Sequence, residues 1–416
     1  MIKKTTMILF VGNVMSPFKL MFFVCLLGAI TGVSYDMYAP SLEAIQASFG
    51  IDNTWSQMTM AIFMGGVAMS QLFYGAFSEG FGRKKAVLLG LSVMLLGSIG
   101  SLASSHIGVL IISRFIQGLG AGVGAALWRS IFRDGFKDEE MAKYGGYLVL
   151  FFLLVLPFAP ILGSILSRFH WWYISLFLLV YNLAALWVVY RYFDETNAHV
   201  DANKWRMSYL VRSYYSFLVN KEFMSIGLSI FFTYGAFTSW FVVGSILITD
   251  KALLGLDHMY FSVASFAVSC SMMFLASMIN NRYLKRVGPD RMLMTGWLLI
   301  SSGGVLMVLL NGVIGLNYTS IIIAVSLLFF GSGFIFPNLF AGAMVPYAHM
   351  AGYAASLYSC IQMLGGFCSG SLLSYVPETS AFPMGIVMII GGVVPMMVYW
   401  LGVIKNPKRH RLYEDQ

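Results

Sequence analysis

Residues 20–42 read LMFFVCLLGAITGVSYDMYAPSL, a run with a single charged side chain, Asp36. A helix needs roughly 20 mostly apolar residues to cross the hydrocarbon core of a bilayer. The run is long enough for one membrane span. Asp36 is the one residue in it that a simple membrane anchor would not require.

Eleven further apolar runs follow this one, at residues 55–77, 86–104, 108–129, 145–167, 172–191, 225–248, 260–279, 292–311, 318–340, 354–375 and 383–403. The chain is 58% apolar and 11% charged, whereas soluble domains are about half apolar and about a quarter charged. We therefore expect an all-α membrane protein with about 12 transmembrane helices. Such a chain has little room for a soluble enzyme domain, and we expect no enzymatic activity.

The distribution of basic residues predicts the orientation. With twelve spans, 23 of the 26 Lys and Arg residues fall on the side that holds both termini, with Arg129, the last residue of the fourth run, counted in the loop that follows it. Only Arg168 and Lys251 lie on the other side, and Arg114 lies inside a run. Loops rich in Lys and Arg stay in the cytoplasm, so both termini are expected there. The net charge of +8 follows from this topology and indicates no nucleic-acid partner.

The runs divide into two sets of six. The longest polar stretch lies between Arg191 and Lys221, at the middle of the chain. The turn that contains Gly82 after the second run has a counterpart at Gly288 after the eighth, which indicates a duplicated unit. We expect an N-terminal half at 1–190, a cytoplasmic linker at 191–224 and a C-terminal half at 225–416.

The loop after the second run reads GAFSEGFGRKK, residues 75–85. It resembles the loop signature of the major facilitator superfamily, with a glutamate in place of the usual Asp and a glycine in place of the Arg that commonly follows. In that family, charge contacts in this loop hold a cytoplasmic gate closed in the outward-open state. The resemblance assigns gate roles to Gly75, Glu79, Gly82, Arg83 and Lys84. The alternative is a basic loop that only obeys the charge rule.

The fourth run contains RFIQGLGAG, residues 114–122, which resembles the arginine-centred motif of drug:proton antiporters. A guanidinium stays charged in a protein, and inside a membrane it needs a cavity or a partner. Asp36 is the only acidic residue in any run, and both residues lie about 9 Å from the outer boundary. We expect Asp36 and Arg114 to couple transport to protons. Alternatively, Asp36 is a wetted helix end and Arg114 a structural partner.

The fifth run contains PFAPILGS, residues 157–164. It resembles the antiporter motif that exporters carry in this span, with Ser164 in place of the second glycine. Pro157, Pro160 and Gly163 would allow a bend and a close approach between helices. A simple kink is the alternative.

Further short strings narrow the resemblance: residues 36–40 (DMYAP), 133–134 (RD), 170–173 (HWWY) and 349–357 (HMAGYAASL). Together they resemble the Bcr/CflA-type multidrug efflux subfamily over nearly the whole chain. The resemblance implies the major facilitator fold, alternating access and a multi-pass protein of the bacterial cytoplasmic (inner) membrane. We expect a monomer whose partners are lipid, protons and a small-molecule substrate.

The resemblance also implies a central cavity lined by spans one, four, seven and ten. Candidate lining residues, with two from span two, are Tyr35, Tyr38, Met64, Gln71, Tyr234, Trp240, Phe336 and Asn338. Aromatic and Met side chains adapt to varied apolar ligands, although any of them could face lipid or a neighbouring helix instead. No His lies in a run, and the four cysteines suit packing, so no metal site and no cofactor are expected.

The function that these patterns favour is proton-coupled export of drugs or other small, largely apolar or aromatic solutes. A carrier for a specific metabolite or siderophore in the same fold is the alternative. A membrane sensor that transports nothing is a more remote one.

Overall fold

The computed structural model describes residues 15–136, 138–197, 200–201, 205, 207–250, 253–376 and 380–405. Within these ranges the regular structure is entirely helical. Several basic residues of the charge count lie outside the described residues: Lys3, Lys4, Lys137, Lys204, Arg206, Lys251, Lys408, Arg409 and Arg411.

The first part of the chain forms α1 (Pro17–Asp36), η1 (Ala39–Ser41), α2 (Leu42–Phe49), α3 (Asn53–Phe81), α4 (Arg83–Leu102), α5 (Ile107–Gly135), α6 (Asp138–Ser167) and α7 (Trp172–Tyr192). After α8 (Met207–Leu218), the second part forms α9 (Lys221–Ser239), η3 (Trp240–Gly244), α10 (Ser245–Thr249), α11 (His258–Val287), α12 (Pro289–Ile314), α13 (Tyr318–Met344), η4 (Val345–Met350), α14 (Ala351–Ser374), α15 (Phe382–Tyr399) and η5 (Trp400–Ile404).

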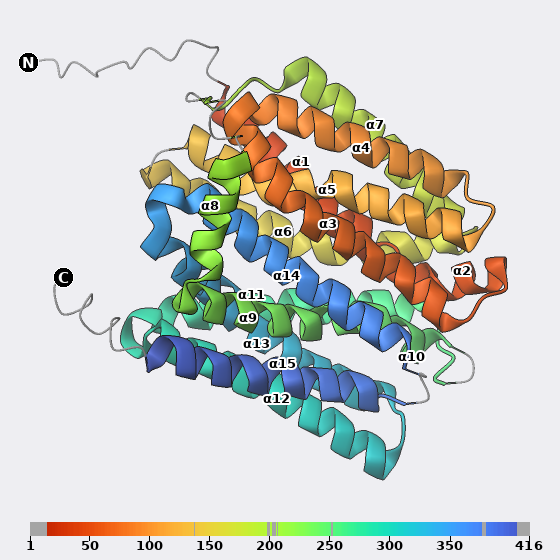
Figure 1. The fold of residues 1–416 in the computed structure, drawn as a ribbon. Coiled ribbons are helices and arrows are strands. Elements are labelled where there is room, and N and C mark those ends of the chain that lie inside the picture. The colour runs from red at the N-terminus through yellow and green to blue at the C-terminus, as the bar shows by residue number, and fades with distance from the viewer. Residues whose placement is uncertain are drawn as a thin grey trace, which may run out of the picture.

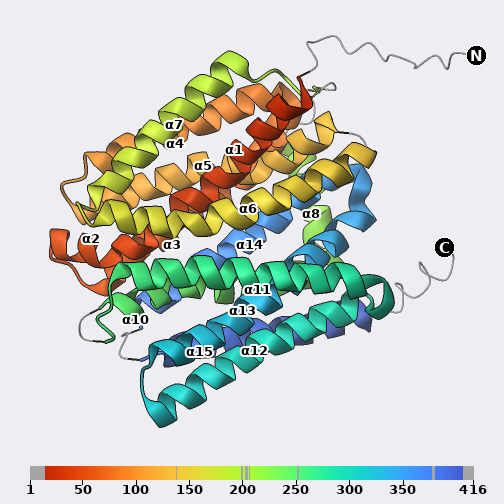
Figure 2. The same ribbon diagram turned by 180° about the vertical axis from the view of Figure 1, so that it is seen from behind.

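Ten stretches among the described residues are long and apolar enough to cross a membrane. The other two expected runs, 145–167 and 354–375, correspond to α6 and α14, which are 30 and 24 residues long. Figures 1 and 2 show both of them running alongside the other long helices. A chain in lipid must satisfy its backbone hydrogen bonds internally, which explains why each apolar run is a helix.

The first expected span, residues 20–42, is not one continuous helix. The helix α1 ends at Asp36, and a 3₁₀ turn at Ala39–Ser41 leads into α2. Pro40 stands in that turn. Proline has no N–H to donate and disfavours the α conformation in the residue before it. The break leaves the Asp36 carboxylate at a helix end.

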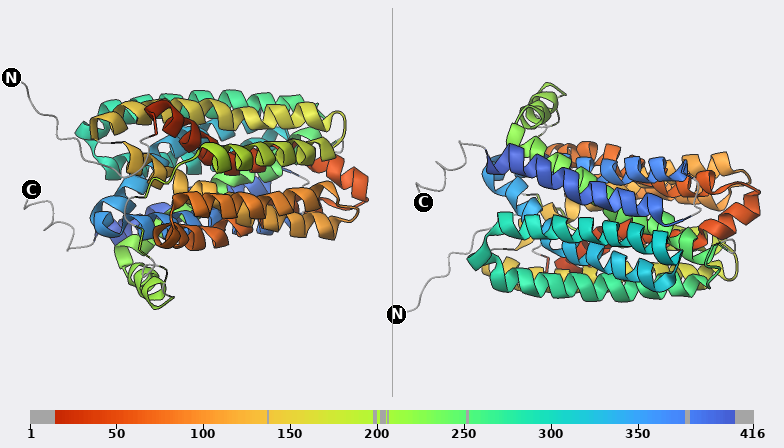
Figure 3. Two further views of the ribbon diagram at one scale, coloured as in Figure 1. Left: turned by 90° about the horizontal axis from the view of Figure 1, so that it is seen from above. Right: turned by 90° about the horizontal axis from the view of Figure 1, so that it is seen from below.

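The helices of the first half gather in the upper part of Figure 1 and those of the second half in the lower part. The two parts meet where α3 lies beside α14 and α6 lies beside α11 (Figures 1 and 2). We call the end of the bundle that holds Lys19, Arg83, Arg133 and Arg286 the basic end, and the end that holds α2 and α10 the far end. The helix α8, yellow-green in Figure 3, lies outside the bundle at the basic end.

The same turn joins α3 to α4 and α11 to α12. Gly82 has φ 98° and ψ 157°, and Gly288 has φ 83° and ψ 156°. A residue with a side chain rarely adopts such a positive φ, which explains the glycine at both places. The matching turns agree with the duplicated unit that the sequence predicts.

Candidate functional site

The candidate site lies between the two halves, where α1 ends. Asp36 is partly exposed to a water-sized probe although it lies inside the bundle, and it makes no hydrogen bond or ion pair with any described residue. Its carboxylate is close enough to Tyr234 of α9 to interact with it electrostatically. Tyr35, beside it, is 2% exposed, and no described residue hydrogen-bonds its hydroxyl. Polar groups without hydrogen-bond partners between the two halves are available to bind a ligand or a proton.

Aromatic rings of the second half face this carboxylate. Tyr234 stacks on Phe237 with ring centroids 5.7 Å apart, and Phe336 of α13 lies 5.3 Å from Phe237. Phe241 continues the row 5.9 Å further on and reaches 6.3 Å from Tyr35 of the first half. Sequence reasoning missed Phe237 and Phe241. Their spacing of three and seven residues from Tyr234, which repeats one face of a helix, could have indicated them.

Arg114 is completely buried but does not pair with Asp36. Its guanidinium donates to the Gln117 Oε1 at 2.9 Å, to the Ser34 carbonyl at 3.1 Å and to the Thr59 carbonyl at 3.4 Å. It also lies 3.9 Å from the Tyr38 ring centroid. The equal depth expected for the two residues agrees with the contact at Ser34, two residues before Asp36. No ion pair joins the two side chains, because Arg114 packs inside the first half while Asp36 faces the second.

Three expected cavity residues lie instead in the packed cores of the halves. Tyr38 is 0% exposed and its hydroxyl shares a hydrogen bond of 2.8 Å with Ser175 of α7. The Trp240 Nε1 donates to Ser265 of α11 at 2.8 Å. Asn338 donates to Asn280 of α11 at 2.7 Å. Each of these polar groups makes its hydrogen bond within one half and does not face the space between the halves.

The remaining two expected cavity residues lie on α3. Met64 is 2% exposed. Gln71 is 0% exposed, and its Nε2 lies 3.5 Å from the Ser359 carbonyl of α14, so it bridges the two halves. Of the eight residues expected to line the cavity, the structure brings together Tyr35, Tyr234 and Phe336 beside Asp36.

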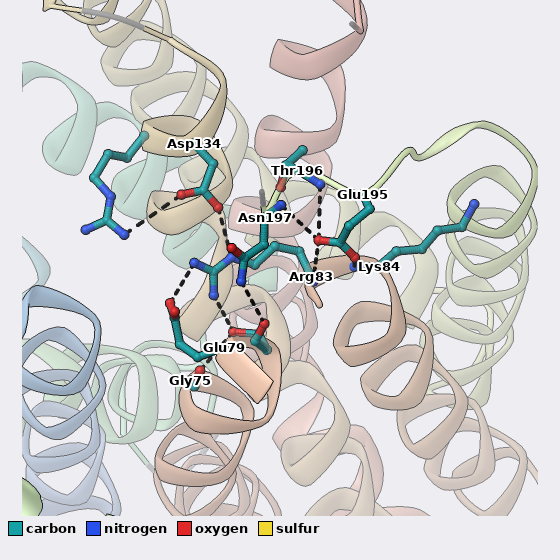
Figure 4. A network of polar contacts seen from close by, with 10 residues as sticks. Gly75, Glu79, Arg83, Lys84, Asp134, Glu195, Thr196 and Asn197 are labelled. Atoms are coloured by element: carbon teal, nitrogen blue, oxygen red, sulfur yellow. Dashed lines mark hydrogen bonds and ion pairs between the residues drawn. The ribbon is translucent and has the colours of Figure 1, made fainter. Parts of the chain in front are cut away.

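The expected gate residues form a network of charges around Arg83 (Figure 4). The guanidinium binds Glu79 at 2.7 Å, Asp134 of α5 at 2.9 Å and Ser78 at 2.5 Å. A Cβ on Gly352, at the start of α14, would lie only 3.7 Å from Glu79 Oε1. A helix N-terminus attracts negative charge, so Glu79 connects the loop to the second half.

Glu195, which sequence reasoning missed, lies in the linker and caps the start of α4 (Figure 4). Its carboxylate accepts from the backbone N–H groups of Arg83 at 2.8 Å and Lys84 at 3.0 Å. A Cβ on Gly82 would collide with this carboxylate, and one on Gly75 would collide with Ser356 of α14. A carboxylate is a common helix cap. Glu195 is 112 residues from Arg83 along the chain, so the sequence alone does not indicate that it caps α4.

The expected motif of the fifth run lies against the second half at the far end. The helix α6 continues through Pro157 and Pro160, and the side chain of Pro157 is outside the described part of the chain. A Cβ on Gly163 would collide with the Met37 carbonyl, so this glycine permits a close approach to the end of α1. Ser164 shares a hydrogen bond of 2.6 Å with Ser262 of α11.

The two halves touch at both ends of the bundle. At the far end, Ser245 of α10 donates to the Ala39 carbonyl at 2.5 Å, and Arg168 pairs with Asp257 at 3.1 Å. At the basic end, the Arg129 guanidinium lies 4.5 Å from the Phe340 ring centroid. The candidate site is therefore enclosed between contacts at both ends.

Arg129, which the charge count assigns to the loop after the fourth run, lies inside α5, which continues to Gly135. The fourth run ends at residue 129 because further charged residues follow closely, whereas the helix continues for about one and a half turns beyond it.

Comparisons with known proteins agree with this fold. The Major Facilitator Superfamily model matches residues 24–370. A bicyclomycin resistance protein homolog of Haemophilus influenzae is 27% identical over 90% of this chain and 93% of its own length. Multidrug resistance protein D of Escherichia coli is 27% identical over 92% of this chain and 95% of its own. A solved peptide transporter in complex with sulfate has a TM-score of 0.74 at 14% identity, covering 95% of both chains.

The family and the relatives define a membrane transporter and not an enzyme. The chain belongs to the Major Facilitator Superfamily.

Proposed function

We propose that this protein exports drugs or other small, largely apolar or aromatic solutes in exchange for protons. The observation that carries the proposal is the unpaired Asp36 carboxylate opposite the aromatic row of Tyr234, Phe237 and Phe336, enclosed between the halves. Aromatic walls accept varied flat or apolar ligands. The relatives named for bicyclomycin and multidrug resistance support export as the direction.

Asp36 is the proton carrier in this proposal. When the far end opens, water reaches the carboxylate and protonates it, and when the basic end opens the proton leaves and the solute enters. Each proton moving inward supplies about 2.3 kcal/mol per 100 mV of membrane potential. Arg114 acts through the backbone, because its contact with the Ser34 carbonyl at 3.1 Å fixes the end of α1 that carries Asp36.

The proposed moving parts are the halves 1–190 and 225–416, joined by the linker 191–224. In this proposal the basic end faces the cytoplasm, as the positive-inside rule predicts, both termini lie inside, and the membrane is a bacterial inner membrane. Glu79, Arg83 and the turn at Gly82 serve as the cytoplasmic gate, and the contact of Gly163 with the end of α1 serves the far end. We propose a monomer, since each chain contains a complete enclosed site.

Proteoliposomes with a pH-sensitive dye inside test this function. The dye reports whether protons leave the vesicles when bicyclomycin is added. The wild type should exchange protons for the drug, and Asp36→Asn should not. Asp52→Asn is a matched control, because Asp52 caps α3 at the far end and Asn caps a helix equally well. The proposal fails if Asp36→Asn vesicles still exchange protons or if no drug in a broad panel moves protons in the wild type.

A further inference from the structure

A second arginine inside the bundle lies near the basic end of α5. Arg129 is six residues before the end of the helix at Gly135, a depth of about 9 Å. Its guanidinium lies between two rings, 4.3 Å from the Trp128 centroid and 4.5 Å from the Phe340 centroid. Phe340 belongs to α13 of the second half, so Arg129 lies where the two halves meet.

This guanidinium makes no hydrogen bond or ion pair with any described residue. The other two buried arginines of the first half differ from it. Arg83 pairs with two carboxylates, and Arg114 donates to three oxygen acceptors. A guanidinium has five N–H donors, and a buried charge without acceptors is costly. Arg129 therefore has unused donors where the protein supplies no described anion.

The side chain of Arg129 is partly exposed although its guanidinium contacts a ring of each half. A ligand can therefore reach the exposed part of the guanidinium. Tyr358 of α14 is close enough to interact with the guanidinium, and its ring lies 5.5 Å from Phe340.

We propose that Arg129 binds the carboxylate of an acidic aromatic solute entering from the basic end. A guanidinium binds a carboxylate through two parallel hydrogen bonds, and the Trp128 ring, on the same helix as Arg129, supplies a face on which a flat ligand stacks. This deepens the proposed export function, on which it rests, by naming a substrate class. Phe340 moves away with the second half when the basic end opens, which exposes the guanidinium to the cytoplasm. The transported solutes thus include aromatic carboxylic acids as well as neutral compounds.

Binding of a matched pair of probes, 2-naphthoate and 2-naphthamide, tests the site in the purified full-length protein. The two probes share a ring system and differ in charge. The wild type should bind the naphthoate at least tenfold more tightly, and Arg129→Gln should bind both probes equally, with Arg129→Lys in between. Arg133→Gln is a matched control, because Arg133 lies one turn further along α5 with a side chain 48% exposed, and it should keep the preference.

Three results would overturn the proposal. The first is a wild type without any preference for naphthoate, and the second is an unchanged preference in Arg129→Gln. The third is an equal loss of both probes in Arg129→Gln, which would mean that Arg129 only holds the two halves together. Asp36→Asn separates this proposal from the export function, because it should abolish proton exchange and keep the preference for naphthoate. Thermal unfolding of each variant confirms that it is folded.

Discussion

Arg114 and Asp36 differ in the number of hydrogen bonds that would be lost if each side chain were removed. Arg114 satisfies the carbonyls of Ser34 and Thr59 and the Gln117 amide from the centre of the first half. Asp36 makes no hydrogen bond with any described residue and faces the second half. The stability of the first half therefore depends on the arginine, whereas no hydrogen bond among the described residues depends on the charge of the Asp36 carboxylate.

This difference predicts opposite effects on stability and transport. Arg114→Gln should lower the free energy of unfolding by about 2 kcal/mol, because buried acceptors lose charged donors. Asp36→Asn should leave the melting temperature unchanged or raise it, while abolishing proton exchange. Thermal unfolding in detergent, followed with a thiol-reactive dye, compares the stability of the two variants. The proteoliposome assay measures proton exchange. A larger loss of stability in Asp36→Asn than in Arg114→Gln would contradict this assignment.

Asp257 predicts a pH dependence at the far end, outside the membrane spans. The Met259 backbone N–H at 2.8 Å and the Arg168 guanidinium at 3.1 Å lower the pKa of this carboxyl below its ordinary value. A depressed pKa means that the contact stabilises the protein above a pH of about 4 and is lost as the pH falls below it.

The comparison that isolates this effect is the wild type against Asp257→Asn, since Asn still caps α11. The difference in melting temperature should be constant from about pH 5 to about pH 8, and it should shrink at lower pH, where Asp257 protonates. Because both charged side chains are about half exposed, salt should also reduce it. A difference that grows as the pH falls would contradict the ion pair.

At the scale of elements, the two repeated turns offer a matched pair. Gly82 and Gly288 share a positive φ, but a Cβ at Gly82 would collide with Glu195, whereas nothing lies within 4 Å of one at Gly288. Alanine at either place costs about 1–3 kcal/mol in backbone strain, because this combination of positive φ and extended ψ is essentially restricted to glycine. Gly82→Ala should cost more, because Glu195 must also release the N–H groups at the start of α4. Equal losses of melting temperature would mean that the linker contributes nothing to this turn.

The apolar runs predicted the helices because length and apolarity are sufficient to identify a span. They did not predict which face of a helix meets a ligand. A helix that is apolar all round has no periodicity from which to choose a face. The sequence therefore does not show that Tyr38, Trp240 and Asn338 pack within one half. Charged residues are better guides to position: Glu79 and Arg83 form an ion pair, and Asp36 lies between the halves. Their roles in gating and proton coupling stay predictions.

At the scale of the whole molecule, the contacts at both ends predict that the resting protein can be locked from either side. Alternating access requires the halves to separate at one end at a time. At the far end, the hydroxyls of Ser164 and Ser262 lie 2.6 Å apart. At the basic end, a side chain on Gly75 would contact Ser356. Cysteines at either pair would be within reach of a disulfide.

The variants Ser164→Cys/Ser262→Cys and Gly75→Cys/Ser356→Cys, in a chain whose four native cysteines are changed to Ser, test this in proteoliposomes. Both pairs should cross-link without substrate, because one enclosed state contains both contacts. Oxidation should stop transport in each, and a reductant should restore it, since either disulfide prevents one end from opening. The single-cysteine variants, which cannot cross-link within one chain, should be insensitive to oxidation. If a variant still transports solute after its two cysteines are cross-linked, the two halves do not separate at that end during transport.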